Sequence, residues 1–147
     1  DAKLARIRAF GAGQMINYNL VPDWDKAVLE MSGGCGVDRV VEVGGPGTLQ
    51  KSITCTRVGG AIQLIGILTG ASSKIVPTDI MRKSISVRGI YVGSRAMFLE
   101  MNAFLTEYKI RPVVDEIFDF DRAQDAFKRL RLATHFGKLV IRVGSNS

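Results

Sequence analysis

The sequence predicts an α/β fold with a parallel sheet, and three observations lead to that prediction. Residues 40–43 and 62–68 are near-continuous apolar runs, which is typical of strands that helices cover on both faces. A Gly-Gly-Pro-Gly turn at 44–47 follows the first run, and the residues after it have helical spacing. Together, residues 37–70 are predicted to form one parallel strand–helix–strand unit, with the glycine-rich turn offering backbone N–H groups and a helix N-terminus to a ligand.

The other elements follow from apolar periodicity and capping residues. Trp24, Ala27 and Val28 have the spacing of one helix face, and Asp23 before them is a candidate N-cap. The elements expected in order are a helix at 1–10, strand 14–18, helix 24–31, strand 39–43, a helix from Pro46 that stops at Gly59-Gly60, strand 61–68, a short helix at 78–83, strand 85–92, a helix at 97–108, strand 117–120, a helix from Asp121 and strand 138–143.

Composition limits the classes of protein that fit. With 147 residues and 46% hydrophobic content, the chain can bury a core, and no apolar run is long enough to predict a membrane span. The net charge of +6 comes from dispersed basic residues without a nucleic-acid-binding motif, so we expect neither nucleic acid nor membrane as a partner. Cys35 and Cys55 are expected to be free thiols, which favours a cytoplasmic location.

Three stretches together resemble a known family. They are KLARIRAFGAGQMINY near the start, VDRVVEVGGPGTLQKS with VGGAIQLIG in the middle, and FDFDRAQDAFKRL with HFGKLVIRV at the end. In this order and spacing they are similar to the C-terminal half of medium-chain dehydrogenases/reductases, within the group of zinc-type alcohol dehydrogenases and quinone oxidoreductases. The resemblance covers nearly the whole chain and implies a Rossmann-like, doubly wound parallel sheet.

The chain also departs from the family pattern. The family's first two strands and G-x-G-x-x-G fingerprint turn would precede Asp1, so we expect an N-terminally truncated Rossmann domain. In the strand order 3-2-1-4-5-6, strand 14–18 would be the third and strand 39–43 the fourth, which leaves strand 39–43 without its central neighbour. We expect residues 1–112 to form this partial domain and residues 113–147 to form a return segment that packs on a GroES-like catalytic domain.

The resemblance implies cofactor-binding residues at the carboxyl ends of the strands and at three basic or aromatic positions. Lys3 would lie near the adenosine ribose or its 2′-phosphate, Tyr18 on the adenosine side, and Lys138 near the phosphates. The residues that would flank the nicotinamide and its ribose are Val43, Gly44, Gly66, Ile67, Leu68, Val92 and Gly93. Simpler roles stay open for all of them, namely tight turns for the glycines, solvated faces for the lysines and core packing for Tyr18. No catalytic residue or metal ligand is expected, because His135 has no partner at ligand spacing.

Three functions fit the sequence. The resemblance implies part of an NAD(P)-dependent oxidoreductase that transfers a hydride between NAD(P)H and a small alcohol, aldehyde, ketone or quinone. Lys3 favours NADP over NAD, zinc would bind elsewhere in a longer parent protein, and we do not expect these 147 residues to be catalytically competent alone. The alternatives are a non-catalytic module that forms a homodimer through the edge of strand 86–92, and a methyltransferase whose Val43–Gly47 turn approaches the methyl donor.

Overall fold

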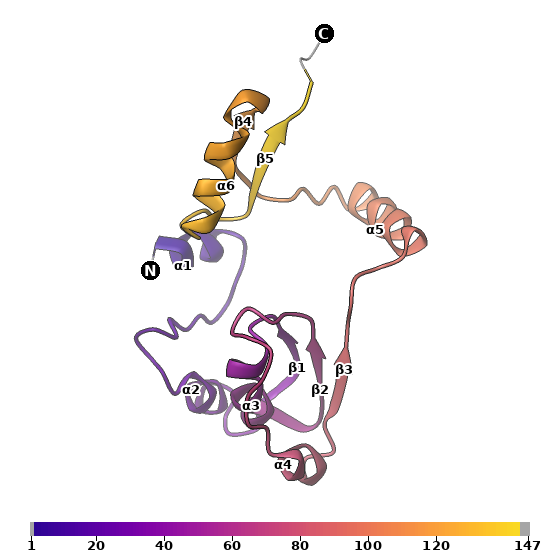
Figure 1. The fold of residues 1–147 in the computed structure, drawn as a ribbon. Coiled ribbons are helices and arrows are strands. Elements are labelled where there is room, and N and C mark those ends of the chain that lie inside the picture. The colour runs from indigo at the N-terminus through magenta and orange to yellow at the C-terminus, as the bar shows by residue number, and fades with distance from the viewer. Residues whose placement is uncertain (1, 145–147) are drawn as a thin grey trace. The chain divides into compact units, whose positions relative to one another are not determined.

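The computed structural model describes residues 2–144 and has two compact units, which divide between Val92 and Gly93 (Figure 1). The elements of the first unit are α1 (Ala2–Ala9), α2 (Trp24–Met31), β1 (Val37–Glu42), α3 (Pro46–Cys55), β2 (Thr56–Leu64), α4 (Pro77–Arg82) and β3 (Ser86–Gly89). Those of the second unit are α5 (Arg95–Glu107), β4 (Val114–Asp119), the 3-10 helix η1 (Phe120–Arg122), α6 (Ala123–Arg131) and β5 (Lys138–Arg142).

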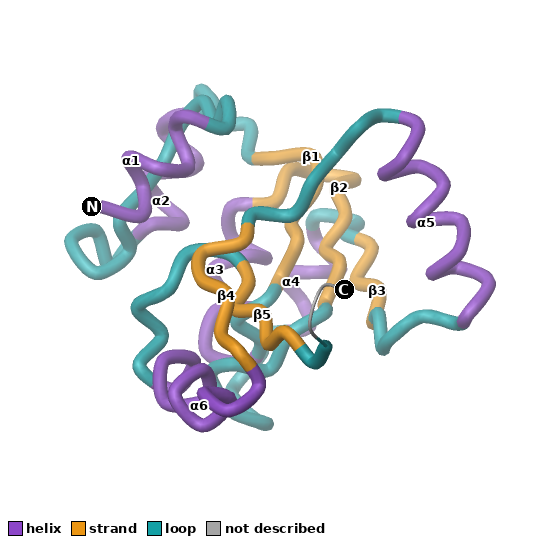
Figure 2. The backbone as a smooth tube through the Cα atoms, turned by 90° about the horizontal axis from the view of Figure 1, so that it is seen from above, coloured by secondary structure: helices purple, strands orange, loops and turns teal. Residues whose placement is uncertain are grey.

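The first unit is built on a parallel sheet in the order β1-β2-β3. Val40 pairs with Ile62, and Ile62 pairs with Val87 on the other side, so β2 lies between β1 and β3 (Figure 2). The register of β1 on β2 shifts once, between Val37 and Arg39. Within residues 2–144, β1 pairs with β2 alone and forms one edge of the sheet. This agrees with the expectation that strand 39–43 lacks a central neighbour in this chain.

A small apolar core lies between α3 and this sheet. Ile53 of α3 and Ile62 of β2 are both 0% exposed, and Ile85 joins them just before β3. The partly buried residues that pack around these three are Val40, Leu49, Ile75 and Ile80. The isoleucines fix the face of α3 that rests on the sheet, and α3 in turn fixes the loop that connects it to β1.

Helix α3 ends at Cys55, four residues before the Gly59-Gly60 pair at which we expected it to stop. The Nζ group of Lys83 donates hydrogen bonds to the carbonyl oxygens of Ile53, Thr54 and Thr56, at 3.3, 2.5 and 3.0 Å. A cation beside the last carbonyl groups stabilises a helix C-terminus, because these groups carry partial negative charge and lack partners inside the helix. Lys83 thus ends the helix early, and the chain enters β2 directly.

The strand predicted at 14–18 is wrong, because these residues form irregular backbone and the start of a turn. The turn begins at Asn17, whose carbonyl oxygen accepts hydrogen bonds from the amides of Leu20 and Val21 at 3.0 and 2.9 Å. A β-strand exists only where a second strand pairs with it. No strand within residues 2–144 pairs with this segment, and its apolar alternation alone does not make it extended.

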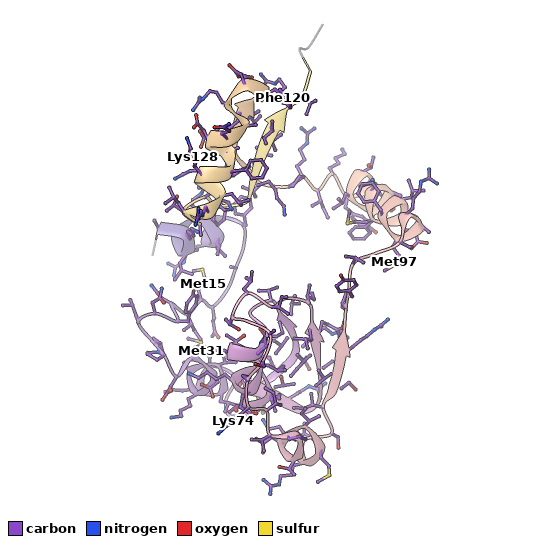
Figure 3. The ribbon with its side chains drawn as sticks, viewed as in Figure 1. Met15, Met31, Lys74, Met97, Phe120 and Lys128 are labelled. Atoms are coloured by element: carbon purple, nitrogen blue, oxygen red, sulfur yellow. The ribbon has the colours of Figure 1, made fainter. Side chains whose placement is uncertain are left out.

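The second unit contains a two-stranded parallel sheet, β4-β5, with α6 packed against it (Figure 2). Phe118 and Ala126 are its buried apolar residues, at 3% and 4% exposure. Helix α5 also lies in this unit. The division into domains at residues 112 and 113 stays a prediction. The side chains of α5 project around the helix, with Met97 near its start (Figure 3), and none is buried. No helix among the described residues is long and apolar enough to cross a membrane.

Candidate functional site

The loops that follow β1 and β2 interlock at the carboxyl ends of these strands. The amide and the hydroxyl of Thr69 both donate to the carbonyl oxygen of Gly44, at 2.9 and 2.8 Å, and the amide of Gly47 donates to the Thr69 hydroxyl at 2.8 Å. The amides of Ile65 and Gly66 continue the ladder to the backbone oxygen at position 42, at 2.9 and 3.1 Å. These contacts tie residues 42–47 to residues 65–69 and make one rigid loop pair.

The side chain of Glu42 is buried against this loop pair, and the residue is 4% exposed. Its Oε1 atom accepts hydrogen bonds from the amides of Gly44 and Gly45, at 2.8 and 2.9 Å, and from the hydroxyl of Thr48 at 2.6 Å. The hydroxyl of Ser52 donates to its other oxygen. Burial by itself raises the pKa of Glu42, but these four donors, beginning with Ser52, together outweigh burial and lower the pKa below its ordinary value of 4.5. Glu42 is therefore a buried carboxylate that stays ionised near neutral pH.

This arrangement corrects our expectation for the glycine-rich turn. We expected the N–H groups of the turn to face a ligand, but the amides of Gly44 and Gly45 donate to Glu42, and the amide of Gly47 donates to Thr69. The chain's own carboxylate thus occupies the N-terminus of α3, where a bound anion would otherwise be stabilised. Because Gly44 uses both of its backbone polar groups inside the loop pair, a ligand could reach only its Cα surface.

Glycine is required at two positions for different reasons. Gly45 has φ of +87°, a backbone region that other residues seldom adopt, and this conformation turns its N–H toward Glu42. At Gly66 the requirement is space, because a Cβ atom there would overlap the carbonyl oxygen of Val43. The two loops can approach this closely only without a side chain at Gly66.

The outer rim of the loop pair is apolar and has unpaired hydrogen-bond donors. Val43, Ile67 and Leu68 are 51%, 72% and 84% exposed. Within residues 2–144, no group accepts a hydrogen bond from the amide of Ile67 or of Leu68. An apolar rim with free backbone donors at the carboxyl ends of parallel strands fits a flat, partly polar ring such as a nicotinamide. On this observation the residues present fit the nicotinamide end of a dinucleotide.

The structure brings together five of the ten predicted cofactor residues. These five are Val43, Gly44, Gly66, Ile67 and Leu68, and all lie in or beside the loop pair. Val92 belongs to the same unit, follows β3 in an exposed segment, and has an unusual φ of +43°. Gly93 and Lys138 belong to the second unit.

The two adenosine-side candidates lie elsewhere in the first unit. Lys3 is on an exposed face of α1, and Tyr18, which is 67% exposed, lies in the turn after it rather than at the end of a strand. Among the described residues, Tyr18 does not pack in a core. The roles of both residues toward a cofactor stay predictions.

The described residues do not supply a metal site. No group of three or more His, Cys, Asp or Glu side chains among residues 2–144 is placed to hold an ion. The Nδ1 atom of His135 is buried and has no hydrogen-bond partner in the structure. A zinc site therefore does not fit these residues, and we derive no chemistry through one.

Glu42 is the functional candidate that the sequence analysis missed. The sequence analysis describes residues 40–43 as a near-continuous apolar run and assigns no role to the glutamate within it. The sequence signal for this role is that Glu42 lies two residues before the Gly44-Gly45 turn, and that Thr48 and Ser52 follow on one face of a helix. That pattern provides two amides and two hydroxyls, which together can solvate a carboxylate.

Comparison with known proteins agrees with this architecture. Residues 1–107 match the family model of zinc-binding dehydrogenases. The chain is 37% identical to a zinc-type alcohol dehydrogenase-like protein of Schizosaccharomyces pombe and 33% identical to one of Leptosphaeria maculans, in each case over 97% of this chain and 42% of the relative. A crystal structure of an NAD-dependent alcohol dehydrogenase superimposes with a TM-score of 0.83 at 29% identity, over 96% of this chain and 41% of that one.

The chain thus spans less than half of the length of each of these proteins. The matches cover both compact units, and the solved structure shares their α/β arrangement with parallel strands. This confirms the resemblance stated from the sequence and the Rossmann-like character of the fold. The chain belongs to the zinc-binding dehydrogenase family.

Proposed function

We propose that this chain holds the nicotinamide half of the cofactor in an NAD(P)-dependent oxidoreductase. The observation that carries the proposal is the rim of the loop pair, where the exposed Val43, Ile67 and Leu68 surround two unpaired amides. When bound, the nicotinamide supplies the hydride chemistry. The chain's own part is to orient the ring on the rim and to shield one of its faces from water with apolar side chains.

The strand order supports this assignment. A Rossmann-like sheet consists of two halves, each of which binds one mononucleotide. The parallel order β1-β2-β3, with β1 at an edge, corresponds to the second half, strands four to six. The second half binds the nicotinamide mononucleotide, whereas the first half carries the phosphate-binding fingerprint.

The whole protein is proposed to reduce or oxidise a small alcohol, aldehyde, ketone or quinone. This proposal rests on family membership and on the named alcohol dehydrogenase-like relatives. We also propose a preference for NADP, in which Lys3 on the exposed face of α1 pairs with the 2′-phosphate, and a cytoplasmic location.

Fluorescence titration tests the cofactor proposal. The full-length natural protein is purified and titrated with NADPH and with NADH. We expect saturable binding of both, and Lys3→Met should weaken NADPH binding about tenfold while NADH binding stays unchanged, because only NADPH carries the 2′-phosphate. The matched control is Lys74→Met, an exposed loop lysine labelled in Figure 3. Absence of saturable binding would contradict the proposed function, and equal weakening of both cofactors would contradict the preference for NADP.

A second candidate function is dimerisation through β3. All four residues of β3 are exposed, and within residues 2–144 this strand pairs only with β2. An open strand edge can extend a sheet into a second copy of the chain. Size-exclusion chromatography with light scattering at several concentrations tests this, and a monomer at every concentration would remove it.

A further inference from the structure

Glu42 has an unusual charge environment for a residue so deeply buried. Its four hydrogen-bond donors are two backbone amides and two hydroxyls, all of them neutral groups. Among the described residues, no Lys, Arg or His forms an ion pair with it. Among the described residues, these donors and the partial positive charge at the N-terminus of α3 stabilise it. The carboxylate is thus solvated by the fold but is not neutralised by a counter-ion.

The charge of Glu42 is held by the same loops that carry the rim. Glu42 is the last residue of β1, and its side chain binds the amides of Gly44 and Gly45, the two residues that follow Val43. Its backbone oxygen accepts from Ile65 and Gly66, which directly precede Ile67 and Leu68. The carboxylate therefore belongs to the same rigid loop pair that carries the rim.

A fixed negative charge at this place discriminates between ligands by their charge. A phosphate at the rim would be repelled, because the helix N-terminus that could stabilise it already holds an anion. A cation would be attracted, and the attraction would be weakly screened by salt since the carboxylate is buried. Oxidised nicotinamide is a cation, whereas reduced nicotinamide is neutral.

From this charge and its place in the loop pair, and building on the proposed function, we infer that Glu42 makes the site favour the oxidised over the reduced cofactor. A fixed unit charge in the loops that carry the rim, partly offset by the helix terminus, is expected to change the ratio of the two dissociation constants about three- to tenfold. Glu42 acts on the ring through its field and through the loop backbone, so it is a positioning residue and makes no direct contact.

The test compares binding of oxidised and reduced cofactor in Glu42→Gln. Glutamine has the shape of glutamate, and its amide oxygen can accept from Gly44, Gly45 and Thr48, so the loop pair is retained while the charge is removed. Kd values for NADP+ and NADPH are measured by isothermal titration calorimetry on the natural protein. We expect Kd for NADP+ to rise about three- to tenfold and Kd for NADPH to change less than about twofold.

A matched control separates charge from structure. Ser52→Ala removes one hydrogen bond to Glu42 but keeps the carboxylate, so it should leave the ratio of the two Kd values unchanged. If Glu42→Gln alone does not fold, because its amide faces the Ser52 hydroxyl too closely, the double variant Glu42→Gln/Ser52→Ala provides the space and is compared with Ser52→Ala.

The outcomes are distinguishable. If the unmodified protein binds neither form, the proposed function fails. If it binds both forms, and removal of the carboxylate leaves the ratio unchanged or weakens both forms equally, then Glu42 has only a structural role and the inference is overturned. A selective loss of NADP+ binding supports it.

Discussion

The two ends of α3 are stabilised by opposite charges, and the ends differ in what surrounds them. At the N-terminus the buried carboxylate of Glu42 accepts from the Gly44 and Gly45 amides, and at the C-terminus the half-buried ammonium of Lys83 donates to three carbonyl oxygens. Both signs complement the helix dipole. At the Glu42 end, however, the adjacent rim leaves amides unpaired and apolar side chains exposed. Lys83 thus stabilises its end of the helix, whereas Glu42 also orders the loops that carry the proposed cofactor-binding rim.

The largest expected effect tests how tightly the loop pair at the Glu42 end is packed. Gly66→Ala should destabilise the protein by about 3 kcal/mol, because the added methyl group would overlap the Val43 carbonyl oxygen and force the loops apart. Urea denaturation measures this. Gly89→Ala is the matched control, since a Cβ atom there meets no neighbour, and it should change stability by less than about 0.5 kcal/mol. Equal stability of both variants would show that the loops are not in close contact.

A smaller loss is expected at the opposite end of the helix. Lys83→Met keeps the length of the side chain but removes the ammonium from three carbonyl oxygens, so the free energy of unfolding should fall by about 2 kcal/mol. Cofactor binding should stay unchanged after correction for folding, because the rim lies at the other end of α3. Lys74→Met is the control for loss of a lysine. Weaker cofactor binding in folded Lys83→Met would contradict the separation of the two ends.

The contribution of Glu42 to stability should depend on pH. The pKa of Glu42 in the folded protein is below its unfolded value of 4.5, so its stabilisation is fully present above pH 4.5 and is lost as the pH falls through the folded pKa. At pH 7, Glu42→Gln should lower the free energy of unfolding by about 1 kcal/mol. The difference from the unmodified protein should shrink on acidification. Urea denaturation between pH 3 and pH 7 measures this, with exposed Glu30→Gln as the control; a pH-independent difference would contradict an ionised Glu42.

The smallest effect is expected at an exposed ion pair near the start of β1. The Nε atom of Arg57 lies 2.5 Å from the Oδ1 atom of Asp38, and this hydrogen bond with Arg57 lowers the pKa of Asp38. Because both groups are exposed to solvent, Asp38→Asn should leave the thermal midpoint nearly unchanged, in contrast to Glu42→Gln. A large loss of stability would mean that solvent does not screen this pair.

Most elements could be predicted from local patterns, and the failure at residues 14–18 shows where such patterns end. The apolar spacing of residues 24–28 predicts the helix Trp24–Met31, the apolar run at 40–43 predicts the strand Val37–Glu42, and both elements are present. A strand at 14–18 would depend on a paired neighbour, which local alternation cannot supply. The early end of α3 likewise depends on Lys83, nearly thirty residues away along the chain.

The candidate cofactor residues stay a prediction, but the structure shows that several of them lie together. Val43, Ile67 and Leu68 were named from the family resemblance and from their place at the carboxyl ends of parallel strands, and all three lie on the rim of the loop pair. The role of Glu42 at the N-terminus of α3 could not be predicted from the sequence, because four separate hydrogen bonds decide whether this buried glutamate is ionised. Those bonds depend on the three-dimensional positions of Thr48 and Ser52.

The central claim is that the rim of the loop pair contacts the nicotinamide end of the cofactor. Quench-flow hydrogen exchange on the natural protein, with and without saturating NADPH, reports directly on the Ile67 and Leu68 amides. We predict that NADPH slows exchange at these two amides, while exchange at the exposed loop amide of Ser72 stays unchanged. If NADPH binds and the Ile67 and Leu68 amides exchange as fast as before, the rim is not the nicotinamide site.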